Sequence, residues 1–585
     1  WVATCAWDDA APEGCGVHAP DEEMPAPAAP NDYHVYGWPV ESPSHGPRSL
    51  RNAPWLDGGI ASPYGWHDTD GAAGPEFTDT RGNNCRAQDD IDANNTGGSR
   101  PDGGPGLDFD FPIDLTQAPS TYLPAAITNL FYWNNVCHDV WYQYGFTEQA
   151  GNFQQNNYGR GGIGNDWVEA DAQDGSGTNN ASFATPPDGG NPRMQMFRWT
   201  QTTPNRDSDL DNVIIAHEYG HGISMRLVGG PANTSCLGNA EQMGEGWSDY
   251  FGLVMTMKPG DSGPVGRGVG TYVKGQGVNG VGIRPARYST SFSQNSYTYA
   301  STNSGLSVPH GIGFVWCTML WEMTWELIGV HGFDPDIYNG TGGNNIAMRL
   351  VIEGLKLTPC NPGFVDARDA ILAADHALYN GANQQHIWAA FARRGLGASA
   401  SQGSSSSRSD QVEAFDMPLS VNLGVAEVVS PMGALFDCAA ANLPVTVRVR
   451  NFGQLAQSGF ELRYQLDGGA EVSAAYAGTL AGGASALFTF PQPLTISGNG
   501  PHTITARTVL PGDQFTGNDQ VTGSVTVSSP AVEPSTYSVN IESTEVLPSG
   551  GGWTTPTTAA HGSPRRLATK RPAWARAHGP STTTR

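Results

Sequence analysis

The sequence has few charged residues and no long apolar run. Only 15% of its 585 residues are Asp, Glu, Lys or Arg, and 31 basic residues face 56 acids, which gives a formal net charge of -25. This balance argues against nucleic acid as a partner, because phosphate binding needs clustered Lys and Arg. No stretch of about 18 consecutive apolar residues occurs, so we expect no membrane span. The acidity favours a soluble, secreted, extracellular surface, with calcium affinity as the alternative.

Cysteine is scarce, and none of the cysteines forms a CxxC pair, which argues against a cysteine zinc site. The eight are Cys5, Cys15, Cys85, Cys137, Cys236, Cys317, Cys360 and Cys438. An even number in a Gly- and Asn-rich chain predicts disulfide bonds formed in an oxidising compartment. Only Cys5 and Cys15 are suggested as a pair, by proximity alone. The chain begins with Trp1 and shows no signal peptide, so we expect a fragment or a processed form.

Apolar residues recur at helical spacing in several segments between residues 124 and 395. The predicted helices are 124–145, 210–227, 243–257, 311–328 and at least two within 362–395. Asp207, Ser208 or Asp209 could cap the second helix, and the Gly229-Gly230-Pro231 run ends it. Residues 31–120 predict turns and short strands. Residues 151–200 are polar and glycine-rich, and end in RMQMFRWT, which alternates as an edge strand does.

The spacing of apolar residues changes near residue 415, from the helical period of 3.6 to the strand period of 2. Residues 398–414 are serine-rich and predict a linker, and residues 415–530 contain short alternating strands separated by Gly, Asn and Asp turns. This pattern predicts an all-β sandwich of the immunoglobulin type. At the two ends of the chain, residues 1–30 predict an irregular segment and residues 531–585 a disordered tail.

Residues 216–227 read AHEYGHGISMRL and contain the pattern His217-Glu218-Tyr219-Gly220-His221. Positions i and i+4 of a helix lie on one face, so His217 and His221 can direct both imidazoles at a single ion. Two histidines and a carboxylate, with one position left for water, suit a catalytic zinc. Glu218 is close enough to accept a proton from that water. Because such five-residue patterns also arise by chance, a third protein ligand is needed to decide whether this one forms a zinc site.

The third ligand is sought on the following helix. A metzincin would have His at position 227, and the chain has Leu227, which excludes that class. Glu245, in MGEGWSD, could bind the ion instead. Asp249 lies one turn later and could accept the free ring N–H of His217, which would fix its tautomer. The alternative is a solvated acidic helix face.

HEYGHGISMRLVGGPANTSCL followed by MGEGWSDYFG resembles the fungalysin family of secreted metallopeptidases, relatives of thermolysin in the gluzincin group. The likeness continues in residues 129–197, in PHGIGFVWCTMLWEM (309–323) and in residues 361–397. It covers roughly residues 32–397. The resemblance implies an α+β, thermolysin-like two-lobed metallopeptidase domain over residues 31–397, with the HExxH helix between the lobes. The β-sandwich would follow as an accessory domain.

The resemblance also implies roles for individual residues. His217, His221 and Glu245 would bind one catalytic Zn²⁺, with Glu218 as general base and His310 stabilising the oxyanion. Asn179, Asn180 and Ala181 would lie along the substrate as an added strand, and Arg284 would contact substrate carbonyls. The side chain after the cleaved bond would be apolar.

The chain departs from the family pattern in three respects. Thermolysin has a tyrosine between the zinc helix and the third ligand, whereas residues 222–249 contain none, so Tyr297 or Tyr299 is a candidate second oxyanion donor. No acid lies in the ten residues before His310. The family's leader and inhibitory propeptide, the mark of a zymogen, are absent from this sequence.

Together these patterns predict a secreted, monomeric zinc endopeptidase acting on polypeptides, with a β-sandwich that could bind substrate or a surface polymer. Two alternatives stay open: a zinc aminopeptidase, and a non-catalytic adhesin with a structural zinc. Ca²⁺ is a candidate second cofactor at Asp174 or in residues 207–211, where solvated turns and helix caps are the alternatives. His138 is expected to be structural, paired with Asp139 or a backbone carbonyl.

Overall fold

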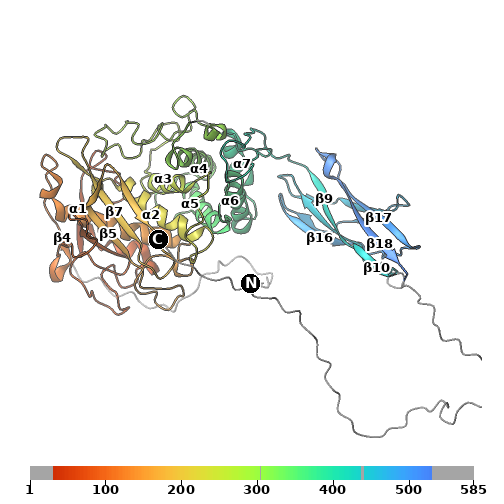
Figure 1. Cartoon of the computed structure of the whole chain (residues 1–585), viewed down its shortest axis with the longest axis horizontal. Helices are drawn as coiled ribbons and strands as arrows, with labels where there is room; N and C mark the ends of the chain where they lie inside the picture. Colours follow the sequence, from red (N-terminus) through yellow and green to blue (C-terminus); the bar gives the residue numbers. More distant parts are fainter. Residues whose placement is uncertain (1–30, 304, 437–439, 530–585) are drawn as a thin grey trace, which may run out of the picture. The chain divides into compact units, whose positions relative to one another are not determined.

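The computed structural model describes residues 31–303, 305–436 and 440–529 (Figure 1). The expectations for residues 1–30 and 531–585 and for the Cys5–Cys15 pair therefore fall outside the described residues. Within the described part, no helix combines the length and apolarity needed to cross a bilayer.

The first part of the chain is built on two sheets. A small sheet has the order β2-β1-β4, from β1 (Asp32–Val35), β2 (Ser49–Asn52) and β4 (Asp108–Phe109). The larger sheet has the order β3-β5-β7-β6, with β8 (Arg206–Asp207) paired to β7. Its strands are β3 (Cys85–Asp89), β5 (Val168–Thr178), β6 (Ala181–Ala184) and β7 (Arg193–Trp199). Strands β3, β5 and β7 are parallel, and β6 runs antiparallel to β7 as the edge strand.

Two features of this sheet differ from expectation. RMQMFRWT does form a strand, but β7 lies between β5 and β6 and is not an edge strand. The central strand β5 falls in the segment that is polar and glycine-rich in sequence, where no strand was predicted before RMQMFRWT. The reason is that β5 buries Asp171, Gln173 and Asp174 where a strand usually buries aliphatic side chains, so its sequence carries little β signal.

The helices follow the predicted segments closely. They are α1 (Leu123–Gln143), α2 (Asn212–Leu227), α3 (Gly244–Met255), α4 (His310–His331), α6 (Phe364–Tyr379) and α7 (Gln384–Arg393). One helix, α5 (Gly343–Leu357), was not predicted, although Met348, Val351 and Leu355 recur at helical spacing. Asp207 caps the short turn before α2 and not α2 itself, whose cap position is Asp211.

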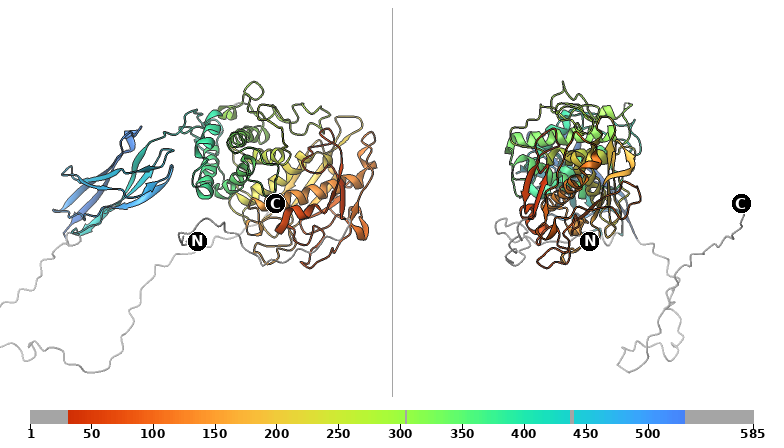
Figure 2. Two further views of the ribbon diagram at one scale, coloured as in Figure 1. Left: turned by 180° about the vertical axis from the view of Figure 1, so that it is seen from behind. Right: turned by 90° about the vertical axis from the view of Figure 1, so that its left-hand side faces the viewer.

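Helix α2 contacts elements of both regions. It packs against α1 and β6 of the strand-rich region and against α3 of the helical region. Helices α3 to α7 gather together, and the left view in Figure 2 shows them beside the strand-rich region. Helices α3 and α4 cross at two glycines: a Cβ on Gly246 would lie 2.2 Å from the carbonyl oxygen of Gly313, and one on Gly313 would lie 2.5 Å from the backbone N of Gly246. This close crossing fixes α3, and with it Glu245.

One disulfide bond and one hydrogen-bonded segment connect distant parts of the helical region. A disulfide joins Cys236, between α2 and α3, to Cys360, just after α5. Residues 398–416, which we call the strap, fold back onto the preceding residues. Backbone bonds pair Gly397 with Ala414 and Ser401 with Val412. The Glu413 carboxylate accepts hydrogen bonds from the loop at residues 298–300.

The remaining strands form two further sheets around one hydrophobic cluster. One sheet has the order β10-β18-β17-β13-β14 and the other β16-β11-β9. The strands are β9 (Leu423–Ser430), β10 (Gly433–Phe436), β11 (Thr446–Asn451), β13 (Glu461–Leu466), β14 (Val472–Ala475), β16 (Ser485–Thr489), β17 (Gly500–Val509) and β18 (Gln520–Ser528), with β12 (Gln457–Ser458) and β15 (Thr479–Leu480) as a separate pair. The cluster takes inward residues from both sheets, including Val447, Leu462 and Ile504. The predicted alternating strands are confirmed.

Candidate metal centre

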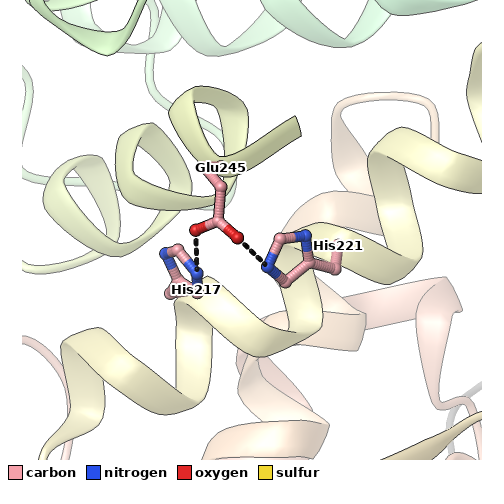
Figure 3. Close-up of side chains that lie close together, drawn as sticks. All are labelled: His217, His221 and Glu245. Carbon is pink, nitrogen blue, oxygen red and sulfur yellow. Dashed lines mark ion pairs between the residues drawn. The ribbon is translucent and has the colours of Figure 1, made fainter. Parts of the chain in front are cut away.

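Two histidines of α2 and one carboxylate of α3 point toward one another (Figure 3). The Nε2 atom of His217 lies 3.3 Å from Oε2 of Glu245, and the Nε2 atom of His221 lies 3.7 Å from Oε1 of the same carboxylate. One donor atom from each residue falls within 4.8 Å of the other two. This spacing leaves room for a single ion between donors of the types that zinc prefers.

Asp249 contacts His217 on the ring nitrogen that faces away from Glu245. It lies one turn after Glu245 on α3 and is fully buried, and its Oδ1 is 2.8 Å from Nδ1 of His217. The Arg284 guanidinium donates to both oxygens of Asp249, at 2.6 and 2.8 Å, and to Oε2 of Glu245 at 3.2 Å. The hydroxyl of Tyr288 also donates to Asp249. With Nδ1 of His217 engaged in this way, Nε2 is the nitrogen that faces Glu245.

The charges at the site perturb its titration. Burial disfavours a charged His217, but the hydrogen bonds and charges of Asp249 and Glu245 outweigh it and raise the pKa of His217 to about 10. Burial and the nearby His217 charge lower the pKa of His221 to about 4. Burial would raise the pKa of Glu245, but contact with His217 holds it well below its usual range. The carboxylates of Asp249 and Glu245 thus favour a positive charge at this place, as a bound cation would supply.

Glu218 has an unusual environment. Its side chain is buried, and Oε2 has no hydrogen-bond partner among the described residues. Burial raises the pKa of Glu218 to about 7. It lines a cleft of about 310 Å³ together with His217, His221 and Glu245. A buried carboxylate oxygen without a partner, beside two imidazoles and a second carboxylate, fits a zinc ion and a water molecule at this place.

The other predicted site residues lie around the same cleft. His310 is the first residue of α4; its Nε2 is 3.4 Å from Oε1 of Glu245, and its side chain is 49% exposed. Asn180 and Ala181 line the cleft at the start of the edge strand β6. Asn179 lies next to them but turns away: its side chain bonds Thr200.

Several apolar side chains and Arg284 complete the wall of the cleft. The apolar ones are Phe183, Trp199, Ile214, Met225, Val269 and Ile283. Neither Tyr297 nor Tyr299 is among the lining residues, and the Tyr299 hydroxyl instead donates to Glu241 at 3.2 Å. Sequence reasoning missed Tyr288, which contacts Asp249 from a segment without regular structure and carries no local motif.

The remaining candidates lie away from the cleft. His138 is buried, with Nδ1 2.8 Å from Oδ1 of Asp139 and Nε2 2.9 Å from Gln154, so its predicted structural pairing is confirmed. Asp207 accepts a hydrogen bond from the backbone N–H of Asp209 and so caps the short turn at residues 208–210.

The comparisons with known proteins agree with this geometry. The model of the fungalysin metallopeptidase family (M36) matches residues 32–400, which is more than half of the chain. Extracellular metalloproteinase 2 of Trichophyton rubrum is 46% identical over 401 residues, covering 66% of this chain and 61% of that protein. Extracellular metalloproteinase mep of Aspergillus fumigatus is 47% identical over 388 residues, covering 64% and 59%.

The chain thus spans about three fifths of the length of these relatives. Among solved structures, a CARDB domain of Pyrococcus furiosus is 19% identical, with a TM-score of 0.16, over 19% of this chain and 96% of that one. The match over residues 32–400 includes both the His217–His221 helix and Glu245. The chain belongs to the fungalysin metallopeptidase family.

Proposed function

We propose that this chain is a secreted zinc endopeptidase that hydrolyses internal peptide bonds of polypeptides. The observation that carries the proposal is the meeting of His217, His221 and Glu245 beside the unpartnered, buried oxygen of Glu218 in one cleft. The names of the relatives, extracellular metalloproteinases, support both the chemistry and the secretion.

His217, His221 and Glu245 would hold the zinc. When bound, the ion supplies a Lewis acid next to the scissile carbonyl. Glu218 accepts the proton of the attacking water and passes it to the leaving amine, because it is buried and free of competing donors. Asp249 accepts a hydrogen bond from Nδ1–H of His217 and so keeps Nε2 directed at the ion. His310, at the exposed rim, donates a hydrogen bond to the oxyanion.

The substrate would lie in extended form along β6. That strand is the open edge of its sheet, and Asn180 and Ala181 line the cleft, which supports pairing between the substrate backbone and the sheet. The apolar wall, with Phe183 and Ile283, favours an apolar side chain after the cleaved bond. Arg284 borders the cleft, held by Asp249, and could contact a substrate carbonyl.

The architecture that we propose is thermolysin-like, with α2 between two lobes. The catalytic domain spans residues 31–397, followed by a serine-rich segment at 398–414, which forms most of the strap, and by an immunoglobulin-like β-sandwich at 415–530. Hydrogen bonds between the strap and the catalytic domain make this segment a packed element more than a free linker. The sandwich would act as an accessory domain on a monomeric enzyme.

The test is cleavage of an internally quenched peptide, blocked at both ends and apolar at its centre. The parent protein and Glu218→Gln are compared, each checked for one zinc per chain by metal analysis. We expect cleavage by the parent and a loss of at least about 10³-fold in the variant. Equal rates would remove Glu218 from the mechanism. Cleavage by neither, with zinc retained, would refute an endopeptidase and leave an aminopeptidase or a structural zinc.

A further inference from the structure

Three buried aspartates meet on the larger sheet, away from the residues of the zinc site. Asp90, Asp171 and Asp174 each offer a carboxylate oxygen, and these oxygens lie within 4.8 Å of one another. All three side chains are buried, with exposures of 1%, 0% and 0%. Buried carboxylates at this spacing repel one another strongly unless something between them carries positive charge.

An irregularity in the backbone of β5 brings Asp171 and Asp174 to the same side of the strand. In a regular strand, residues 171 and 174 would point to opposite faces, because they are an odd number of positions apart. The β5–β7 register shifts between Asp171 and Asp174, and Gln173 lies in the left-handed region at φ 47°. This bulge turns Asp174 to the same side as Asp171.

Asp90 is fixed against the bulge by its own backbone. Its N–H donates to the carbonyl of Ala172, and its carbonyl accepts from the N–H of Gly175. The approach is so close that a Cβ on Gly175 would lie 2.0 Å from the carbonyl oxygen of Ile91. Only glycine can therefore occupy position 175, and Asp90 is held between Asp171 and Asp174.

One oxygen in the cluster has no partner. Oδ1 of Asp90 accepts two bonds at 3.0 Å, from the backbone N–H groups of Asn94 and Asn95. Oδ2 of Asp90 is buried and makes no hydrogen bond to any described residue. Since Oδ1 is turned to the loop, Oδ2 is the oxygen left for the cluster. An orphaned buried carboxylate oxygen is costly, and it indicates a missing partner.

The other contacts of the cluster do not neutralise it. Asp171 accepts from Gln88 and pairs with Arg193, and Asp174 accepts from the backbone of Ser176 and from Gln195. Three carboxylates therefore face one guanidinium, which leaves a formal charge of -2. The donors are all oxygens, with no histidine or cysteine, which suits a hard divalent cation.

We propose that Asp90, Asp171 and Asp174 form a calcium site that ties the loop after β3 to the bulge of β5. Calcium takes several oxygen ligands in a flexible geometry, which suits carboxylates already positioned by separate elements. The ion would stabilise the sheet whose edge strand, β6, borders the zinc cleft. This proposal concerns stability and does not depend on the proposed peptidase activity.

The experiment uses the full chain carrying Glu218→Gln, loaded with zinc, so that self-digestion cannot confuse the readout. Calcium chloride is titrated into calcium-depleted protein by calorimetry, and thermal unfolding is followed with and without calcium. We expect tight binding and an upward shift of Tm by several degrees. Asp90→Asn should weaken calcium binding by about tenfold or more. Its Tm without calcium should equal or exceed that of its parent, because one repelling charge is gone.

Asp68→Asn is the matched control. Asp68 also has a buried, unpartnered oxygen and clusters with Asp70 and Glu76, but those two are exposed. The control should keep the calcium response. Absence of any calcium response in the parent, its survival in Asp90→Asn, or its loss in Asp68→Asn alone would each overturn the assignment, as would tighter binding of magnesium. If Asp90→Asn does not fold, Asp174→Asn provides the same comparison.

Discussion

Replacing Asp249 by Asn tests whether the zinc site depends on the group behind it. Asp249 accepts four hydrogen bonds, one from His217, two from Arg284 and one from Tyr288. An asparagine keeps the shape but has only one acceptor oxygen. If its NH₂ group faces His217, the ring proton must move to Nε2, on the side of Glu245. In either orientation the NH₂ group also faces an N–H of Arg284, which donates to both Asp249 oxygens, so two donors oppose each other.

Either orientation has a calculable cost. Loss of the partner that orients a metal-binding histidine typically weakens metal affinity by about 10–100-fold, which corresponds to about 1.4–2.7 kcal/mol. Leaving a buried guanidinium without its carboxylate destabilises a fold by about 3–5 kcal/mol. Arg284 keeps its 3.2 Å contact with Glu245, so we expect the lower end, about 3 kcal/mol.

The assay measures both quantities on the same preparations. Zinc affinity comes from competition with a chromophoric chelator, and stability from urea unfolding followed by circular dichroism. Glu322→Gln is the control, because Glu322 is a buried carboxylate that pairs with Arg393 and Arg394 but does not line the cleft. It should lose stability and keep zinc affinity. Unchanged zinc affinity in Asp249→Asn, beside a normal loss of stability, would refute the orienting role.

Three further changes probe the frame around the site. Replacing Cys236 and Cys360 by Ser opens a bridge with a sequence separation of 124 and should cost about 4–5 kcal/mol in urea unfolding; an unchanged midpoint would contradict this. Gly313→Ala should cost about 1–3 kcal/mol and weaken zinc binding by pushing α3 away, whereas Gly329→Ala, with nothing within 4 Å, should do neither. Burial lowers the pKa of His67 to about 4, so as the pH falls the unfolded chain binds a proton at this residue before the folded chain does. The free energy of unfolding should therefore fall by about 3 kcal/mol between about pH 6.5 and pH 4. The variant His67→Gln should lose correspondingly less stability over this range, and an equal loss would argue against this residue.

Local patterns predicted those parts of the fold that local interactions determine. The helical period located α1, α2, α3 and α4 to within a few residues, and the two-residue period located the strands after residue 420. The i, i+4 spacing of His217 and His221 similarly predicted that they share a helix face. These features follow from side-chain direction along a single element.

Long-range features left little trace in the sequence. Strand β5 was missed because half of its buried residues are polar, and Asp171 and Asp174 find their partners on β3 and β7, far away in the chain. The contact of Tyr288 with Asp249 joins segments 39 residues apart through a loop without periodicity. Of the two suggested tyrosines, Tyr299 donates its hydroxyl to Glu241 and not into the cleft. The sequence could not predict this, because the position of a residue along the chain does not tell which way its side chain points from a loop.

The strap has a consequence for dissecting this protein into pieces. Its Glu413 holds Thr298 and Ala300, and its Arg408 donates to the carbonyl of Leu306, so it anchors the loop that runs into His310. A shortened chain that stops at residue 397 would free that loop and could lose activity although every cleft residue is present. The suitable end point is residue 416, because Asp416 still accepts hydrogen bonds from Ala398 and Ser399. Expression designs that cut within the serine run would thus release the loop before His310 as well as remove the strands after residue 420.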